Sequence, residues 1–183
     1  MPFAVTPSEV IAAFGVDGVT YYPLDSSIPG LRHEKTAKFL SSVGIPHDDV
    51  FMSRAEVGAA DPEIIVVGEK FDAQGRICPP EARGWLVLAY FSYSLVALDP
   101  ADGRVYSFPE GEDSCIPLHR DVESLTYSLL ALKSFGNSVQ GEEDRESSAA
   151  QMRNSIESFD SLPFADPESE WNVIYDEIED GVW

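Results

Sequence analysis

The sequence predicts an α+β fold in which an antiparallel meander within residues 84–110 is covered by helices. Residues 85–91 form a short, unbroken apolar run, which is too short for a membrane-spanning helix and is typical of a strand covered on both faces. Residues 95–98 form a second strand. Residues 104–108 alternate polar and apolar side chains, as in a strand with one covered face. The helices that flank this stretch are expected to supply its covering.

A tight turn connects the last two of these strands. Pro100 presets φ for the second position of a type I turn, and Gly103 adopts positive φ where the chain re-enters the ladder. Pro109 ends the following strand because it has no N–H to donate. Asp99, Asp102 and Asp113 also invite a calcium interpretation, but they lack the ligand spacing of an EF-hand. We therefore interpret the aspartates of the turn as turn residues.

The N-terminal part of the chain predicts a capped helix. Thr6 and Glu9 form a capping box, and Pro7 occupies the first helical position. The helix is expected to run through Phe14 and to stop at Gly15.

Shorter elements are predicted between this helix and the meander. Residues 33–43 form a second helix with one apolar face, which Gly44 ends. Short strands are predicted over residues 19–22, 50–52 and 64–68. Residues 69–80 read as a hairpin end or loop with Gly75 as its turn residue.

After the meander, residues 115–118 predict one more strand, and Asp121 caps a helix that runs to Phe135 and closes at Gly136. Residues 137–149 are polar, and we interpret them as either a loop or the mobile start of the next helix. A helix is also predicted over residues 150–159. A last helix opens around Asp166.

One core and one domain are expected. At 183 residues with 44% apolar side chains, the chain suits a single domain spanning residues 1–183. The predicted core comprises Leu86, Leu88, Val96, Leu98, Leu125, Leu129, Leu132 and Trp171.

The composition limits the possible partners and the compartment. The net charge is −20, which opposes binding to nucleic acid and favours basic partners. The two cysteines, Cys78 and Cys115, are too few for a disulfide framework, and the N-terminus carries no secretory signal. We therefore expect a cytoplasmic protein that binds neither nucleic acid nor membrane.

The sequence predicts no catalytic, cofactor or metal site. It contains no nucleophile elbow and no P-loop, and its three histidines are scattered. Cys115 and His119 lie four residues apart, but no further ligands have suitable spacing. We expect a buried thiol near an exposed imidazole. The competing hypothesis is a small hydrolase that uses this pair or two carboxylates.

Several segments, in their order along the chain, resemble a known family. They are residues 39–46 (FLSSVGIP), 95–99 (LVALD), 103–106 (GRVY), the helix that ends in Phe135 and Gly136, and the last helix with Trp171. The chain resembles the SUKH superfamily, and within it family 4 of its immunity proteins, over nearly its whole length.

This resemblance implies a curved, mainly antiparallel sheet with helices packed around it. It also implies a non-enzymatic immunity protein that binds a toxin delivered between competing bacteria, such as a nuclease or a nucleic-acid deaminase. The family has no catalytic residues to carry over. The same superfamily resemblance leaves an intracellular regulatory or scaffold protein as an alternative.

An acidic surface on the meander is the predicted binding site for a basic toxin domain, because carboxylates can replace nucleic acid in the toxin's cleft. Tyr93 and Tyr106 are the predicted anchors of this surface, since exposed tyrosines often supply interface energy. The ordinary alternative for each carboxylate is a solvated turn residue. The predicted surface comprises Tyr93, Asp99, Asp102, Tyr106, Glu110, Glu112 and Asp113.

Overall fold

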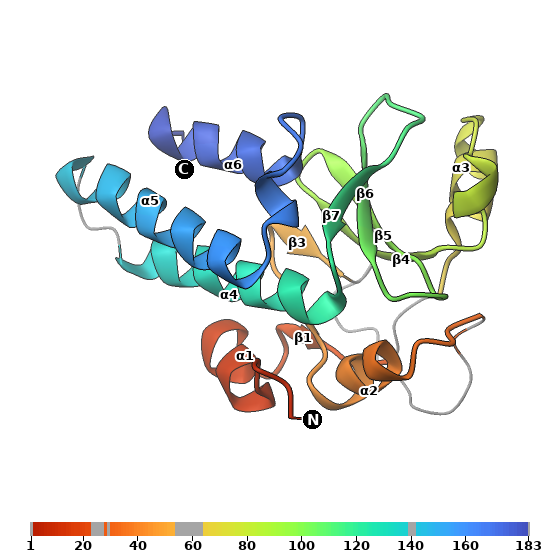
Figure 1. The fold of residues 1–183 in the computed structure, drawn as a ribbon, viewed down its shortest axis with the longest axis horizontal. Coiled ribbons are helices and arrows are strands. Elements are labelled where there is room, and N and C mark those ends of the chain that lie inside the picture. The colour runs from red at the N-terminus through yellow and green to blue at the C-terminus, as the bar shows by residue number, and fades with distance from the viewer. Residues whose placement is uncertain (1, 23–27, 29, 54–63, 139–141, 183) are drawn as a thin grey trace.

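A computed structural model describes residues 2–22, 28, 30–53, 64–138 and 142–182, and it shows an α+β fold (Figure 1). Its main sheet is antiparallel, with the strands side by side in chain order from β3 to β7. The five strands are β3 (Phe51–Met52), β4 (Leu86–Phe91), β5 (Ser94–Leu98), β6 (Val105–Pro109) and β7 (Ile116–His119). A separate antiparallel pair joins β1 (Val19–Thr20) to β2 (Ile45–Pro46). The predicted meander is confirmed.

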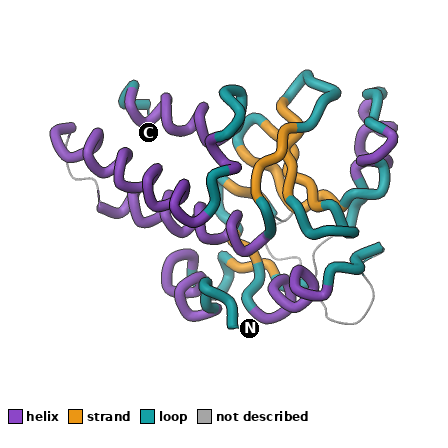
Figure 2. The backbone as a smooth tube through the Cα atoms, viewed as in Figure 1, coloured by secondary structure: helices purple, strands orange, loops and turns teal. Residues whose placement is uncertain are grey.

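Helices lie on both faces of the main sheet (Figure 2). One face packs against the long helices near the C-terminus, and the other is covered in part by α3. The helices are α1 (Pro7–Phe14), α2 (Glu34–Ser42), α3 (Val67–Gln74), α4 (Val122–Ser138), α5 (Glu142–Phe159) and α6 (Glu170–Glu179). Short 3₁₀ turns span Pro80–Ala82 and Leu162–Phe164.

The helix caps follow the local sequence. Thr6 and Glu9 form both hydrogen bonds of the predicted capping box. Asp121 Oδ1 accepts from the Ser124 N–H at 2.9 Å and so caps α4. In both places a short polar side chain satisfies a backbone donor at the start of the helix, which has no partner inside the helix.

The turn between β5 and β6 requires glycine for two reasons. Gly103 has a φ of +82°, and its N–H donates to the Asp99 carbonyl at 2.9 Å. A Cβ at this position would lie 2.3 Å from His33 Nδ1 and 2.4 Å from Thr36 Oγ1. The turn therefore combines a left-handed backbone with close packing against the start of α2.

The eight predicted core residues are all buried, at 6% exposure or less. They belong to the cluster between the sheet and the C-terminal helices, where Trp171 contacts Phe91 edge-on. A second cluster on the opposite face joins α3 to the sheet through Phe71, Trp85 and Phe108.

The prediction of a strand over residues 64–68 followed by a loop over 69–80 was wrong. Only Val66 makes a bridge to the sheet, opposite Leu86, and the chain then forms α3. Val67 and Phe71, four residues apart, are buried on one helical face. The apolar run that precedes α3 hides this spacing, because a short apolar run is ambiguous between strand and helix. Gly75 ends α3 in the left-handed conformation.

The C-terminal helix boundaries also differ from those predicted. Helix α4 continues through Gly136 to Ser138, and α5 already begins at Glu142, so the helical alternative holds for most of residues 137–149. Residues 139–141 lie outside the described part of the chain. Helix α6 begins at Glu170 rather than near Asp166, because the Ser169 side chain is its N-cap.

Candidate partner-binding surface

The predicted acidic surface is divided between the two ends of β6. Asp99 and Asp102 precede this strand, and Glu110, Glu112 and Asp113 follow it. A strand of this length spans roughly 17 Å. In Figure 1 the β5–β6 turn lies at the lower end of the sheet, near α2, and the β6–β7 turn projects at the upper end. The acidic surface predicted on the meander is thus divided into two separate surfaces.

At the lower end, the aspartates hold the turn together. Asp99 Oδ1 accepts from the Ala101 N–H at 2.8 Å, and Asp102 Oδ1 accepts from the Arg104 N–H at 2.9 Å. The Asp102 carboxylate also pairs with the Arg104 guanidinium at 3.6 Å. The local geometry of the turn therefore accounts for both side chains.

At the upper end, Tyr93 presents an exposed ring on a fixed backbone. Its side chain lies in the turn between β4 and β5, and the residue is 56% exposed. The Tyr93 N–H donates to Glu170 Oε1 at 3.3 Å, and the Tyr93 carbonyl accepts from the Glu110 N–H at 2.8 Å. Burial raises the pKa of Glu170, and hydrogen bonds from Ser94 and Tyr93 only partly offset this effect. The backbone that carries the ring is thus held in place by two hydrogen bonds.

An open hollow of about 270 Å³ adjoins Tyr93. Met52, itself 43% exposed, contributes to its wall together with Phe108. The polar groups of the lining include Tyr90, Glu110 and Arg76. The hollow therefore combines apolar surface with a carboxylate and a guanidinium.

Arg76, at the end of α3, fastens the β6–β7 turn. Its Nε lies 3.5 Å from Asp113 Oδ1, and its Nη2 donates to the Glu112 carbonyl. The guanidinium also lies 4.2 Å over the Phe71 ring. In contrast, the Glu110 carboxylate forms neither a hydrogen bond nor an ion pair with any residue that the structure describes.

Tyr106 is not an exposed anchor. Its ring is half-buried and stacks on Trp85, with 4.2 Å between the ring centroids. It belongs to the cluster beneath α3. Sequence alternation alone could not distinguish this partly covered face from an open one.

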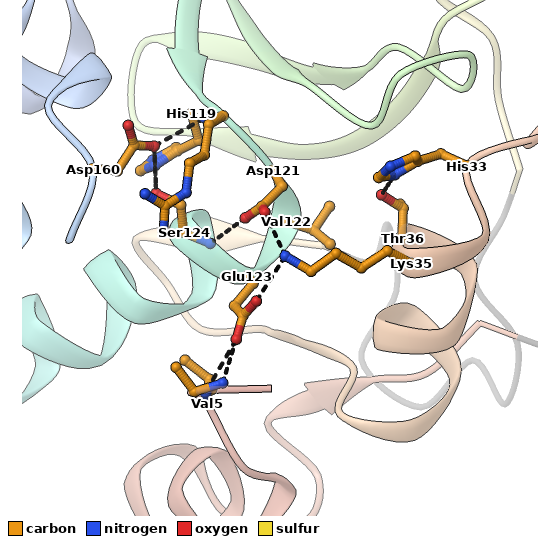
Figure 3. A network of polar contacts seen from close by, with 12 residues as sticks. Val5, His33, Lys35, Thr36, His119, Asp121, Val122, Glu123, Ser124 and Asp160 are labelled. Carbon is orange, nitrogen blue, oxygen red and sulfur yellow. Dashed lines mark hydrogen bonds and ion pairs between the residues drawn. The ribbon is translucent and has the colours of Figure 1, made fainter. Parts of the chain in front are cut away.

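A buried polar network connects β7 to the C-terminal helices (Figure 3). Trp171 Nε1 donates to His119 Nε2 at 2.8 Å, so the imidazole carries its proton on Nδ1. His119 Nδ1 lies 2.9 Å from Ser124 Oγ, which donates to Asp160 Oδ2 at 2.6 Å. Every side chain of this network is buried.

Burial determines the charge of this network. It lowers the pKa of His119 to about 3, against the opposite effect of the Asp160 carboxylate. Burial alone would raise the pKa of Asp160, but hydrogen bonds from Arg120 N, Ser124 Oγ and Leu162 N lower it. At neutral pH, a neutral imidazole therefore faces a carboxylate through a serine hydroxyl.

This set of residue types matches a hydrolytic triad, but its geometry does not. A triad histidine accepts the serine proton on a free nitrogen, with the carboxylate bound to the other nitrogen. Here Trp171 occupies Nε2, and the Ser124 hydroxyl is directed at Asp160. The network was not predicted from the sequence, because its members come from distant segments without a local motif.

The expected environment of Cys115 and His119 was wrong, because His119 is buried and Cys115 is half-buried. Cys115 packs with the cluster beneath α3, whereas His119 contacts Trp171 on the other face of the sheet. A register shift between β6 and β7 at Val105 and Tyr106 breaks the alternation that would place both on one face. The two side chains therefore do not form a catalytic pair.

A second polar cluster at the start of α4 also joins segments of the fold (Figure 3). Lys35 of α2 pairs with Asp121 at 2.8 Å and with Glu123 at 3.0 Å. The buried Glu123 carboxylate also accepts from the Ala4 and Val5 N–H groups. These contacts attach the N-terminal segment and α2 to α4.

The described residues include no group of three or more His, Cys, Asp or Glu side chains that could hold a metal ion. Within the same part of the chain, no helix has the length and apolar character needed to cross a membrane.

Comparison with known proteins agrees with the sequence resemblance. A search of curated proteins and a search of solved structures each returned no match. The family model of the SUKH-4 immunity proteins, however, matches residues 5–177. This match includes the meander, the buried network and α4, so the chain belongs to the SUKH-4 immunity protein family.

Proposed function

We propose that this protein is a non-enzymatic immunity protein that binds a cognate toxin domain and blocks its active site or substrate path. Membership of the SUKH-4 family carries this proposal, since an immunity protein implies a toxin as its partner. The engaged geometry of His119, with both ring nitrogens bonded inside the fold, supports binding rather than catalysis.

The toxin that fits best is a basic enzyme acting on nucleic acid, a nuclease or a deaminase. Such an enzyme presents positive charge to phosphates. A protein with a net charge of −20 attracts that surface and accelerates encounter. The three exposed carboxylates of the β6–β7 turn, Glu110, Glu112 and Asp113, give this field a projecting contact surface.

The test is binding to the polypeptide encoded beside this protein, followed by protection of cells that express that toxin. Reversing Glu110, Glu112 and Asp113 to Lys should lower the association rate about tenfold at low salt. A matched control reverses three exposed carboxylates at the end of α6, Asp176, Glu179 and Asp180. If wild-type protein neither binds nor protects, the immunity function is wrong.

A further inference from the structure

We propose that the hollow beside Tyr93 receives a basic side chain, arginine or lysine, from the toxin. This inference rests on the proposed function and adds to it the place and the chemistry of the contact. The hollow lies between the β4–β5 turn, β6 and the end of α3, as its lining residues Ser92, Phe108 and Gln74 show.

The exposed ring of Tyr93 has the properties of an interface anchor. Both backbone polar groups of Tyr93 are hydrogen-bonded, one of them to the buried Glu170 side chain. A partner that packs on this ring therefore loses little entropy in ordering the turn. Tyrosines are enriched among the residues that dominate binding energy.

The polar groups of the hollow match a cation with an apolar stem. The Tyr90 hydroxyl is buried and has no hydrogen-bond partner among the described residues. Tyr90 and Glu110 both line the hollow, and the Glu110 carboxylate is also without a hydrogen bond or ion pair to a described residue. A guanidinium or ammonium group would donate to the Glu110 carboxylate, and to the Tyr90 hydroxyl once neighbouring side chains shift to expose it, while Met52 and Tyr93 would cover its aliphatic stem.

The positive groups nearby are already in use. Arg76 itself lines the hollow, but its guanidinium pairs with Asp113 and lies over Phe71 rather than on Glu110. Lys70 Nζ lies 5.1 Å from the centre of the Tyr90 ring, so this lysine is placed over the ring face. An acidic side chain in the hollow would face the Glu110 carboxylate in a protein of strong negative charge, which excludes an anion as the preferred occupant.

The protein contains an internal example of the same recognition. In a second hollow, beside α4, Lys133 Nζ pairs with Asp48 at 3.2 Å and lies 5.2 Å from the centre of the Phe14 ring. A cation there is held between a carboxylate and an aromatic ring. The hollow beside Tyr93 offers the same combination without an internal cation on the Glu110 carboxylate.

The experiment measures the dissociation constant for the toxin domain encoded beside this protein. Tyr93→Ala and Glu110→Gln should each weaken binding at least tenfold. Matched controls are Tyr21→Ala, which removes a tyrosine that is 40% exposed elsewhere, and Glu168→Gln, on an exposed carboxylate before α6. Both controls should bind within twofold of wild type.

Tyr90→Phe separates a binding role from a structural one. The variant removes only a hydroxyl that has no hydrogen-bond partner among the described residues, so its thermal stability should equal or exceed that of wild type. Its affinity for the toxin should nevertheless fall at least threefold. A matching loss of stability and affinity would contradict the role assigned to this hydroxyl.

A double-mutant cycle identifies the occupant. Each Lys and Arg of the toxin is replaced in turn and tested against wild type and Glu110→Gln. One replacement should weaken binding to wild type at least tenfold but binding to Glu110→Gln by less than threefold. If the wild type binds the toxin but no replacement couples to Glu110, or if Tyr93→Ala binds normally, the hollow is not the site and the immunity function stands. If the wild type does not bind, both proposals fail.

Discussion

Replacing His119 by Phe tests whether the buried network is structural. The new ring fills a similar volume but leaves the Trp171 N–H without its acceptor, while Ser124 keeps its bond to Asp160. A buried donor without a partner costs about 1–3 kcal/mol. We therefore expect a loss of about 2 kcal/mol in the free energy of unfolding at pH 8.

The pH dependence gives a sharper signature. His119 has a folded-state pKa of about 3 and an ordinary value of 6.5, so between these values the unfolded chain binds the extra proton. The stabilisation is complete above pH 6.5 and is lost as the pH falls towards 3. A pH of 5 lies about 1.5 units below the unfolded-state pKa, and this difference corresponds to a loss of roughly 2 kcal/mol in the free energy of unfolding. The stability advantage of wild type over His119→Phe should therefore shrink by this amount between pH 8 and pH 5.

The assay is urea unfolding at pH 8, 7, 6 and 5. Taking the difference between wild type and His119→Phe cancels the contribution of Glu170, whose raised pKa acts in the opposite direction. His33→Gln, which replaces a histidine outside the network, is the matched control. Parallel pH profiles for wild type and His119→Phe would refute the argument.

Three further predictions concern the fold. Gly103→Ala should lower the free energy of unfolding by about 2–4 kcal/mol, because it adds both backbone strain and a clash with α2. Its control, Gly111→Ala, has a φ of +84° but no atom within 4 Å of the new Cβ, so it should cost about 1 kcal/mol. Equal losses in urea unfolding would show that the clash is relieved. Leu88→Ala and Leu125→Ala should each cost about 2–5 kcal/mol and unfold in a single transition if residues 1–183 form one domain, so unchanged melting temperatures or two transitions would count against this core. The start of α5, residues 142–148, should exchange amide hydrogens faster than the rest of that helix, as measured by mass spectrometry, because the first N–H groups of a helix have no partner inside it, and strong protection across this start would contradict that expectation.

Local chemistry made much of this fold predictable. The turn at Pro100 and Gly103 and the capping box of Thr6 and Glu9 depend on neighbours within a few residues, and the structure confirms both. The core positions on α4 follow from helical spacing. Helix α3 was missed because its buried residues are few and follow an apolar run that suits either strand or helix.

Long-range packing explains what the sequence could not predict. The His119 network forms only where β7, α4 and α6 contact one another, and no residue spacing along the chain indicates this contact. The burial of Tyr106 depends on Trp85, which stacks on it across the sheet. The division of the acidic surface, in contrast, could have been predicted from the sequence, since successive turns of an antiparallel meander lie at opposite ends of the sheet.

The two charge-reversal variants can separate steering by the whole protein from contact at the hollow. Each reversal changes the charge by two units, so three reversals take the net charge from −20 to −14 at either location. If the overall field alone governs encounter, the variant at Glu110, Glu112 and Asp113 and the variant at Asp176, Glu179 and Asp180 should slow association equally. If the β6–β7 turn meets the toxin, only the first variant should show a large loss, and that loss should shrink as salt screens the charges. Equal association rates for the two variants at every salt concentration would place the interface elsewhere. Otherwise, the difference between their rate losses measures how much of the effect comes from direct contact at the β6–β7 turn.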